Sequence, residues 1–243
     1  MAYEFISVER DGPVTVVTLN RPDVMNALHS PAHHELHDAF DAFAADPDQW
    51  VAIVTGAGER AFSAGNDLKH QATGGGMGLP PSGFAGLTER FDLTKPLIAA
   101  VNGVAMGGGF EIALACDLII AAETATFALP EPRVGLAALA GGLHRLPRQI
   151  GEKRAMGFVN EVVPAADLMT AARRWAAQIC ELSPMSIRAS KEAVFKGLDE
   201  VSLAAAMAAQ MRYPAISAML RSEDFKEGPM AFAQKRPPQW KGR

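Results

Sequence analysis

The sequence has little cysteine, no excess of basic residues and no long apolar run. Two cysteines in 243 residues, Cys116 and Cys180, stand in apolar surroundings, so neither a disulfide framework nor a cysteine metal site is expected. The formal net charge of −4 lacks the basic excess that nucleic-acid-binding proteins carry. No run of apolar residues is long enough to cross a membrane, and the first residues lack a signal-peptide pattern. We therefore expect a cytoplasmic protein without a nucleic-acid or membrane partner.

The residues that are present indicate an α/β protein with a largely parallel sheet. Apolar residues make up 49% of the chain and charged residues 21%, which is ordinary globular composition. Apolar runs typical of strands alternate with helical spacing, which favours parallel strands joined by helices. We predict a hairpin over 5–20, a helix over 30–47 and buried strands within 50–58, 96–103 and 117–131. After Pro164 the pattern is almost purely helical, so we divide the chain into a core over 1–164 and a helical region for oligomerisation over 165–243.

Three short motifs permit chemistry that the rest of the sequence does not support. Residues 56–61, GAGERA, resemble a dinucleotide-binding turn, but no long helix follows, so a plain turn is favoured. Ser63 in AFSAGN resembles a nucleophile elbow, but the first glycine is replaced by Ala61. The run HHELH over 33–37 lacks the spacing of the metalloprotease motif, and a solvated helix face is favoured. We predict no metal site.

Backbone donors and two glutamates form the stronger candidate site. Glycines at 107–109 allow N–H groups at a helix start to approach a ligand, and the helix dipole favours negative charge there. Together with an N–H from SAGND over 63–67, they are suited to bind an oxyanion. Glu111 opens the helix, and Glu131 lies between two prolines in an apolar stretch, where a buried carboxyl tends to keep its proton. The alternatives are a glycine turn followed by a first-turn acid, and a Glu131 that pairs with an arginine, either Arg133 or Arg145.

Together these residues resemble the crotonase superfamily, the enoyl-CoA hydratase and isomerase family. The resemblance covers nearly the whole chain, through TLNRPDVMNAL, FSAGNDLK, AAVNGVAMGGGFEIALACDLIIAAETATFALPE and SEDFKEGPMAFAQKRPPQW. The segment LPEPRVGL is also similar to carnitinyl-CoA dehydratase-type members. The resemblance implies a spiral of ββα units with a C-terminal helical trimerisation region. It also implies an acyl-CoA substrate, whose coenzyme A is not a separate cofactor, and a homotrimer or a dimer of trimers.

The resemblance also assigns residues and a reaction. The backbone N–H groups of Asn66 and Gly108 correspond to the oxyanion hole, and Glu111 and Glu131 to the two glutamates of hydratases. Residues that correspond to the substrate and CoA site are Ala27, Leu28, Ala64, Asp67, Leu68, Lys69 and Gly107. The expected reaction is reversible hydration of 2-enoyl-CoA to 3-hydroxyacyl-CoA. The alternatives are double-bond isomerisation, thioester hydrolysis, and a non-catalytic trimeric scaffold.

Two features of the sequence leave the substrate open. The family carries an additional stretch where Gly157 here meets Phe158, and the register resumes at once, which favours a segment absent from the printed sequence over a true deletion. The glycine-rich residues 71–83 are either a wall of the acyl pocket or a surface loop. In the C-terminal region, Arg236 and Lys241 either meet CoA phosphates of a neighbouring subunit or are solvated.

Overall fold

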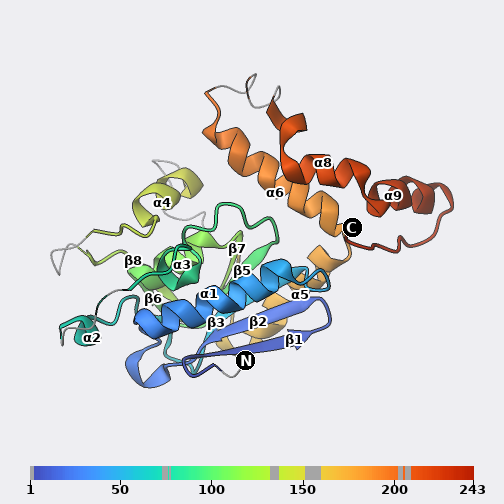
Figure 1. Cartoon of the computed structure of the whole chain (residues 1–243). Coiled ribbons are helices and arrows are strands. Elements are labelled where there is room, and N and C mark those ends of the chain that lie inside the picture. The colour runs from blue at the N-terminus through green and yellow to red at the C-terminus, as the bar shows by residue number, and fades with distance from the viewer. Residues whose placement is uncertain are drawn as a thin grey trace.

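Two β-sheets organise the chain up to residue 163 in the computed structural model, which describes residues 3–72, 76, 78–131, 137–150, 160–201, 205 and 209–243 (Figure 1). The larger sheet has the order β1 (Ile6–Asp11), β2 (Val14–Leu19), β3 (Val51–Gly56), β5 (Leu97–Val101), β7 (Leu118–Ala122) and β9 (Glu161–Val163). Only the β1–β2 hairpin is antiparallel among these pairs. The smaller sheet is parallel and contains β4 (Ala61–Ser63), β6 (Val104–Met106) and β8 (Thr126–Ala128).

Successive strands from β3 to β8 alternate between the larger and the smaller sheet, so the chain winds as a spiral. Each of β3, β5 and β7 in the larger sheet is followed in the sequence by β4, β6 or β8 in the smaller one. The predicted α/β spiral with a largely parallel sheet is therefore confirmed. The helices are α1 (Ser30–Ala45), α2 (Leu68–Ala72), α3 (Gly108–Ala115), α4 (Gly142–Ile150), α5 (Leu168–Cys180), α6 (Pro184–Asp199), α8 (Pro214–Arg221) and α9 (Glu223–Ala233).

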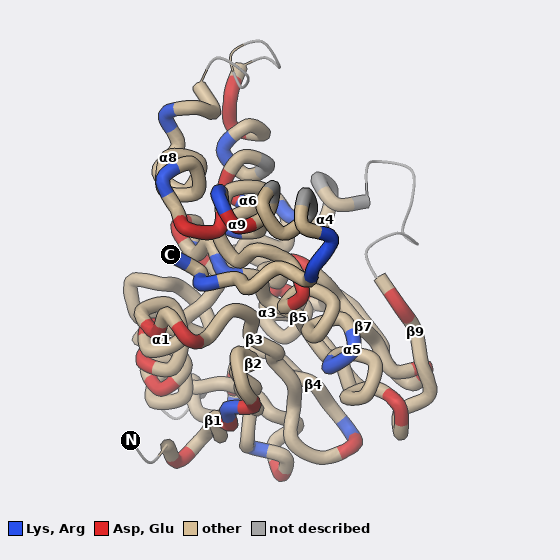
Figure 2. Tube along the Cα trace, turned by 90° about the vertical axis from the view of Figure 1, so that its right-hand side faces the viewer, with Lys and Arg blue, Asp and Glu red and all other residues tan. Residues whose placement is uncertain are grey.

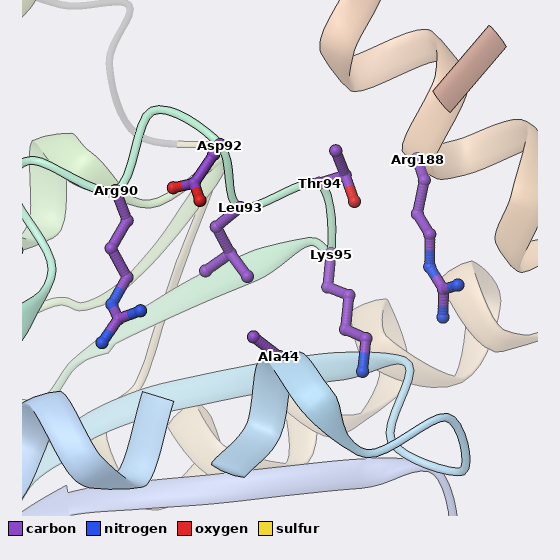
Figure 3. A pocket seen from close by; sticks show the side chains of 7 residues that line it. All are labelled: Ala44, Arg90, Asp92, Leu93, Thr94, Lys95 and Arg188. Atoms are coloured by element: carbon purple, nitrogen blue, oxygen red, sulfur yellow. The ribbon is translucent and has the colours of Figure 1, made fainter. Parts of the chain in front are cut away.

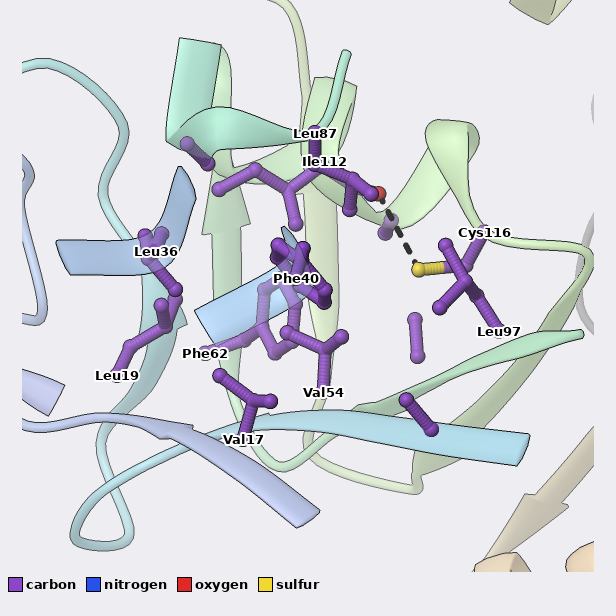
Figure 4. Packing of buried hydrophobic residues seen from close by; sticks show 14 of the residues in the cluster. Val17, Leu19, Leu36, Phe40, Val54, Phe62, Leu87, Leu97, Ile112 and Cys116 are labelled. Carbon is purple, nitrogen blue, oxygen red and sulfur yellow. Dashed lines mark hydrogen bonds between the residues drawn. The ribbon is translucent and has the colours of Figure 1, made fainter. Parts of the chain in front are cut away.

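The central strands are buried on both faces, because α1 and α3 cover one face of the larger sheet and α5 covers the other. Alternate side chains of a strand point to opposite faces. In β3, Val54 packs with Phe40 of α1 and Ile112 of α3, whereas Ile53 packs with Ala172 of α5. Figure 4 shows the first of these clusters around Phe40 and Val54. This two-sided burial explains why strands β3, β5 and β7 are continuous apolar runs without charged residues (Figure 2).

After residue 164, the first helix packs against the larger sheet and the later helices extend away from it. Helix α5 contributes Ala171, Ala172 and Ala176 to the packing of the larger sheet. Helices α6, α8 and α9 extend away from that sheet at the upper right of Figure 1. Lys191 of α6 connects them to the core, because its Nζ lies 2.6 Å from Asp117 Oδ2 next to β7. The division at residue 164 remains a prediction, and its first helix belongs to the packing of the sheet.

Candidate active site

Three segments meet at the carboxyl ends of the strands of the smaller sheet. Asn66 follows the end of β4, Gly108 begins the helix that follows β6, and Glu131 follows the end of β8. Because β4, β6 and β8 are parallel neighbours, the segments that leave their carboxyl ends lie side by side. Such an edge is where α/β proteins commonly bind ligands. The two predicted donors and the two predicted glutamates are thus gathered around the N-terminus of α3.

The backbone of Asn66 is oriented by a parallel bridge to Leu28. The Leu28 N–H donates to Gly65 O at 2.8 Å, and the Asp67 N–H donates to Leu28 O at 2.8 Å. In a parallel pair with this pattern, the N–H of the middle residue, Asn66, points away from the Leu28 strand. Neither this N–H nor that of Gly108 has an acceptor among the residues that the structure describes.

Glycine is required where the Asn66 segment touches α3. A Cβ added to Gly65, whose φ is +87°, would lie 2.7 Å from Met106 O and 2.8 Å from Gly108 N. A Cβ added to Gly109 would lie 2.0 Å from Ser63 O. The glycines therefore let two backbone segments approach closely, so that their free N–H groups lie at one place. This arrangement, and the positive end of the helix dipole, suit an oxygen that carries negative charge.

Glu111 lies in the first turn of α3 and is almost fully buried, with 4% of its surface exposed. Its Oε1 accepts a hydrogen bond from the Gly142 N–H at 2.9 Å, at the start of α4. Burial raises the pKa of this carboxyl above its usual range, and the charge of Glu131 raises it further. The N–H groups of Gly142 and Ala140 and the charge of Arg145 oppose that rise without cancelling it. Glu111 is therefore a carboxyl group whose environment favours the protonated form.

Glu131 lies at the same helix start. A Cβ added to Gly107 would lie 3.0 Å from Glu131 Oε1, so the carboxylate lies against the residue that precedes α3. Both of its oxygens are buried and lack a hydrogen-bond partner in the described part of the chain. Arg145 instead donates to Thr88 O at 2.7 Å, and Arg133 lies outside the described residues. A buried carboxyl group without a structural partner is available for proton transfer.

The residues assigned to CoA lie along the bridge and the short helix α2. Ala27 and Leu28 are buried, so only their backbone borders this edge. Ala64 donates its N–H to Met25 O at 2.9 Å. Asp67 accepts hydrogen bonds from the His70 N–H at 3.0 Å and from Arg21 Nη1 at 3.0 Å. Burial alone would raise the pKa of Asp67, but these two bonds hold it below its usual value. Leu68 and Lys69 are exposed on α2.

The three weaker motifs have structural roles. Ser63 is fully buried, and its Oγ donates to Asn26 O at 2.8 Å and accepts from the Gly65 N–H at 3.1 Å, so it holds the turn before Asn66. The motif at 56–61 contains the end of β3, the turn at 57–60 and the start of β4. His33 and His37 bind the segment that follows residue 81. Within the described residues no group of acidic, histidine or cysteine side chains could hold a metal ion, and no helix there is long and apolar enough to cross a bilayer.

Two cavities lie elsewhere, between the core and α6. The smaller, of about 180 Å³, is lined by Lys95 and Arg188 among others (Figure 3). Lys95 Nζ donates to Phe43 O at 2.7 Å and to Asp46 O at 2.5 Å, so it caps the carboxyl end of α1. Burial, with the nearby charge of Arg188, lowers the pKa of Lys95 to about 8. The larger cavity, of about 620 Å³, separates the loop at 91–94 from α6 and α8. Neither cavity contains a predicted site residue.

Comparisons with known proteins show the family and the fold of the chain. The model of the family described as enoyl-CoA hydratase/isomerase matches residues 9–158 and 152–243. The chain belongs to the enoyl-CoA hydratase/isomerase family. A carnitinyl-CoA dehydratase of Salmonella typhi is 43% identical over 264 residues, covering 99% of each chain. The crystal structure of an enoyl-CoA hydratase from Mycobacterium tuberculosis H37Rv superposes with a TM-score of 0.90 at 36% identity, covering 98% of this chain and 99% of that one.

A second solved structure is named for carnitinyl-CoA, as is the Salmonella typhi relative. The carnitinyl-CoA hydratase of Mycobacterium avium has a TM-score of 0.75 and 38% identity, and the match covers 100% of both chains. The likeness to crotonase-fold enzymes thus extends over the whole of this family member, including its C-terminal helices. The predicted crotonase-like fold is confirmed.

The comparisons also bear on the junction at Gly157 and Phe158, which lies outside the described residues. The alignment with the Salmonella typhi relative spans 264 positions against 243 residues here, so it opens gaps in this chain. The family match breaks into two parts that overlap at 152–158, around the junction. An intact mass of the purified protein above 25.8 kDa is the expected result if a segment is absent from the printed sequence. A measured mass of 25.8 kDa would instead establish a true deletion.

Proposed function

We propose that this protein catalyses the reversible addition of water to a 2-enoyl-CoA thioester, giving a 3-hydroxyacyl-CoA. The observation that carries the proposal is the pair of glutamates whose carboxyl oxygens are buried at the α3 N-terminus. Glu111 is held by the Gly142 N–H, and Glu131 lies against Gly107. An isomerase can operate with a single acid–base group, so two carboxyl groups at one oxyanion site favour hydration or dehydration.

In the proposed mechanism the thioester oxygen accepts hydrogen bonds from the N–H groups of Asn66 and Gly108. Negative charge grows on that oxygen as the double bond reacts, and fixed donors stabilise it. In dehydration Glu131 takes a proton from Cα, and Glu111, whose environment favours the protonated form, gives its proton to the hydroxyl that leaves Cβ as water. In hydration the same transfers run backwards: Glu111 takes a proton from water, whose oxygen adds to Cβ, and Glu131 gives its proton to Cα.

The substrate is held, in this proposal, along the Leu28–Asn66 bridge. The pantetheine follows residues 66–69, with Ala27, Leu28 and Ala64 beside the CoA and Gly107 at the thioester. Arg236 is less suited to a CoA phosphate, because it forms a two-point ion pair with Glu227 at 2.6 and 2.9 Å. Two relatives are named for carnitinyl-CoA, so carnitinyl-CoA is the first 3-hydroxyacyl thioester that we propose as a specific substrate.

We also propose that the chain assembles as a homotrimer or a dimer of trimers through its C-terminal helices. Apolar side chains are exposed on α6, α8, α9 and the turns between them, and a second copy of the chain would cover them. They include Phe195, Leu198, Met211, Phe225 and Met230. Helices that extend from the core, as Figure 1 shows, are free to pack between subunits.

The reaction is tested by following the conjugated thioester absorbance of crotonyl-CoA. We expect fast loss of absorbance with the wild-type protein and none with Glu111→Ala. Carnitinyl-CoA should give the reverse change, a gain of absorbance on dehydration. Product analysis with 2-enoyl and 3-enoyl thioesters separates hydration from isomerisation and thioester hydrolysis. Absence of every reaction, with acyl-CoA still bound, would favour the scaffold.

A further inference from the structure

One face of α1 binds the segment 82–90 at three successive helical turns. Residues four apart on a helix share a face, and His33 and His37 of the HHELH motif lie on this one together with Asp41. The contacts are His33 Nδ1 with the N–H of Ala85 at 3.0 Å, His37 Nδ1 with Ser82 Oγ at 2.7 Å, and Asp41 Oδ1 with Arg90 Nη1 at 2.6 Å. The motif therefore serves to hold a neighbouring segment in place.

The segment 82–90 contains a turn with an unfavourable backbone conformation. Ala85, in the 3₁₀ turn Phe84–Gly86, has φ 55° and ψ 22°, a left-handed conformation that an alanine rarely adopts. A Cβ added to Gly86 would lie 2.3 Å from the backbone nitrogen of His37, so the turn is pressed against α1. Strained residues of this kind persist where the surroundings fix them, and they cluster at functional sites.

The turn places an aromatic ring on the proposed oxyanion hole. A Cβ added to Gly108 would lie 2.5 Å from Cζ of Phe84, so the ring contacts one of the two donor residues. On its other side the ring packs against His33, with ring centroids 4.5 Å apart. Leu87, which follows the turn, is buried in the same cluster as Ile112 of α3 (Figure 4). Phe84 thus stands beside the point from which the acyl chain of a bound thioester would extend.

His33 is suited to hold this ring and unsuited to proton transfer. It is fully buried, and burial lowers its pKa to about 4, so the ring is neutral near neutral pH. Because Nδ1 accepts from Ala85, the proton of the ring is on Nε2, and that atom has no partner among the described residues. A leucine would fill the position without burying such a polar atom. The feature that only histidine supplies here is the acceptor at Nδ1.

We propose that His33 is a positioning residue that fixes Phe84 against Gly108 and thereby limits the length of acyl chain that the site accepts. The proposal rests on the proposed function, since it assumes an acyl thioester at the α3 N-terminus. In this proposal residues 82–90 form a wall of the acyl pocket. His33 acts on the substrate only through Phe84.

The test compares three replacements of His33 that differ in where they place an acceptor. The amide oxygen of asparagine takes the position of Nδ1, that of glutamine takes the position of Nε2, and leucine has none. The measured quantity is the ratio of the dissociation constants of butyryl-CoA and octanoyl-CoA, two saturated thioesters that bind without being hydrated. We expect His33→Leu and His33→Gln to shift this ratio towards octanoyl-CoA by about fivefold or more, and His33→Asn to keep the wild-type ratio.

Two further variants complete the comparison. Phe84→Ala should shift the ratio in the same direction as His33→Leu, because it removes the wall itself. His34→Leu is the matched control on the exposed side of α1, where His34 Nδ1 contacts Ser30 O of the preceding helical turn at 2.9 Å. It should leave the ratio unchanged. If the leucine variant does not fold, the glutamine and asparagine variants carry the same comparison.

An unchanged ratio in folded His33→Leu and His33→Gln would overturn the proposal, as would an equal shift in His33→Asn or His34→Leu. Because the probes are unreactive, this result is separate from hydration. A shifted ratio in a protein that hydrates no enoyl-CoA would support the role of His33 and contradict the proposed function. Hydration by the wild type together with an unshifted ratio in the His33 variants would support the proposed function and contradict the role of His33. A wild type that binds neither thioester would overturn both.

Discussion

Replacing Glu111 by glutamine is expected to lower the hydration rate by on the order of 10²- to 10⁴-fold, the usual contribution of one acid–base group. The amide oxygen can still accept from the Gly142 N–H, which now binds Oε1 at 2.9 Å, so the start of α4 keeps its position. What is lost is the group that exchanges a proton with water. The measurement is kcat with crotonyl-CoA. Glu59→Gln, at an exposed turn position, is the matched control and should retain the wild-type rate.

The same variant is expected to be more stable than the wild type at neutral pH. Burial and the charge of Glu131 raise the pKa of Glu111 in the folded state. The folded protein therefore gains stability from the protonated form, a gain present below the usual pKa of 4.5 and lost as the pH rises through the raised value. Glutamine cannot ionise, so it keeps that gain. Thermal unfolding should show a higher Tm for Glu111→Gln at neutral pH and a smaller difference in acid. A Tm advantage independent of pH would contradict this origin.

Gly65→Ala is expected to lower kcat by on the order of 10²- to 10³-fold, as loss of an oxyanion donor does in other enzymes. The added methyl group would lie 2.7 Å from Met106 O and 2.8 Å from Gly108 N, so the Asn66 segment must move away from α3. The two N–H groups would then no longer converge on one oxygen. The measurement is kcat and KM with crotonyl-CoA, together with the Tm.

The control for this variant separates crowding from backbone strain. Gly58 also has a positive φ, +76°, but a Cβ there would meet only Pro22 Cβ at 3.5 Å, an ordinary contact. Gly58→Ala should therefore cost about 1 kcal/mol of stability and leave kcat unchanged. Equal loss of kcat in both variants would show that strain alone, and not the approach of Gly65 to α3, disturbs the reaction.

Patterns of sufficient length predicted the fold well. The helix expected over 30–47 is α1, and the apolar runs at 50–58 and 96–103 contain β3 and β5. Strands β4 and β6 were not predicted, because three residues are too few for an alternating pattern to be recognised. Yet these two strands set the position of Asn66 and Gly108. The family resemblance supplied the pairing of those residues, which local periodicity alone did not contain.

Contacts between distant residues were the part that the sequence did not reveal. The Gly142 N–H that holds Glu111 comes from 31 residues further along the chain, and Ala85 lies 52 residues from His33. Nothing near either residue signals its partner. The run HHELH was predicted to be a solvated helix face, which is wrong for His33, because that side chain is fully buried. The partners of His33 and His37 are a backbone N–H and a serine hydroxyl in another segment. Only the folded chain relates the motif to the site.

The order of the strands in the larger sheet has a consequence for how the chain folds. Going across the sheet from β1 to β9, the strands follow one another in the same order as in the sequence. Each new strand therefore pairs with one that the chain has already produced, and no later segment has to insert between two earlier ones. During synthesis, each turn of the spiral can dock on the turn before it as it leaves the ribosome. Helices α6, α8 and α9, which lie outside this sheet, are made last and find their partners after the strands have paired.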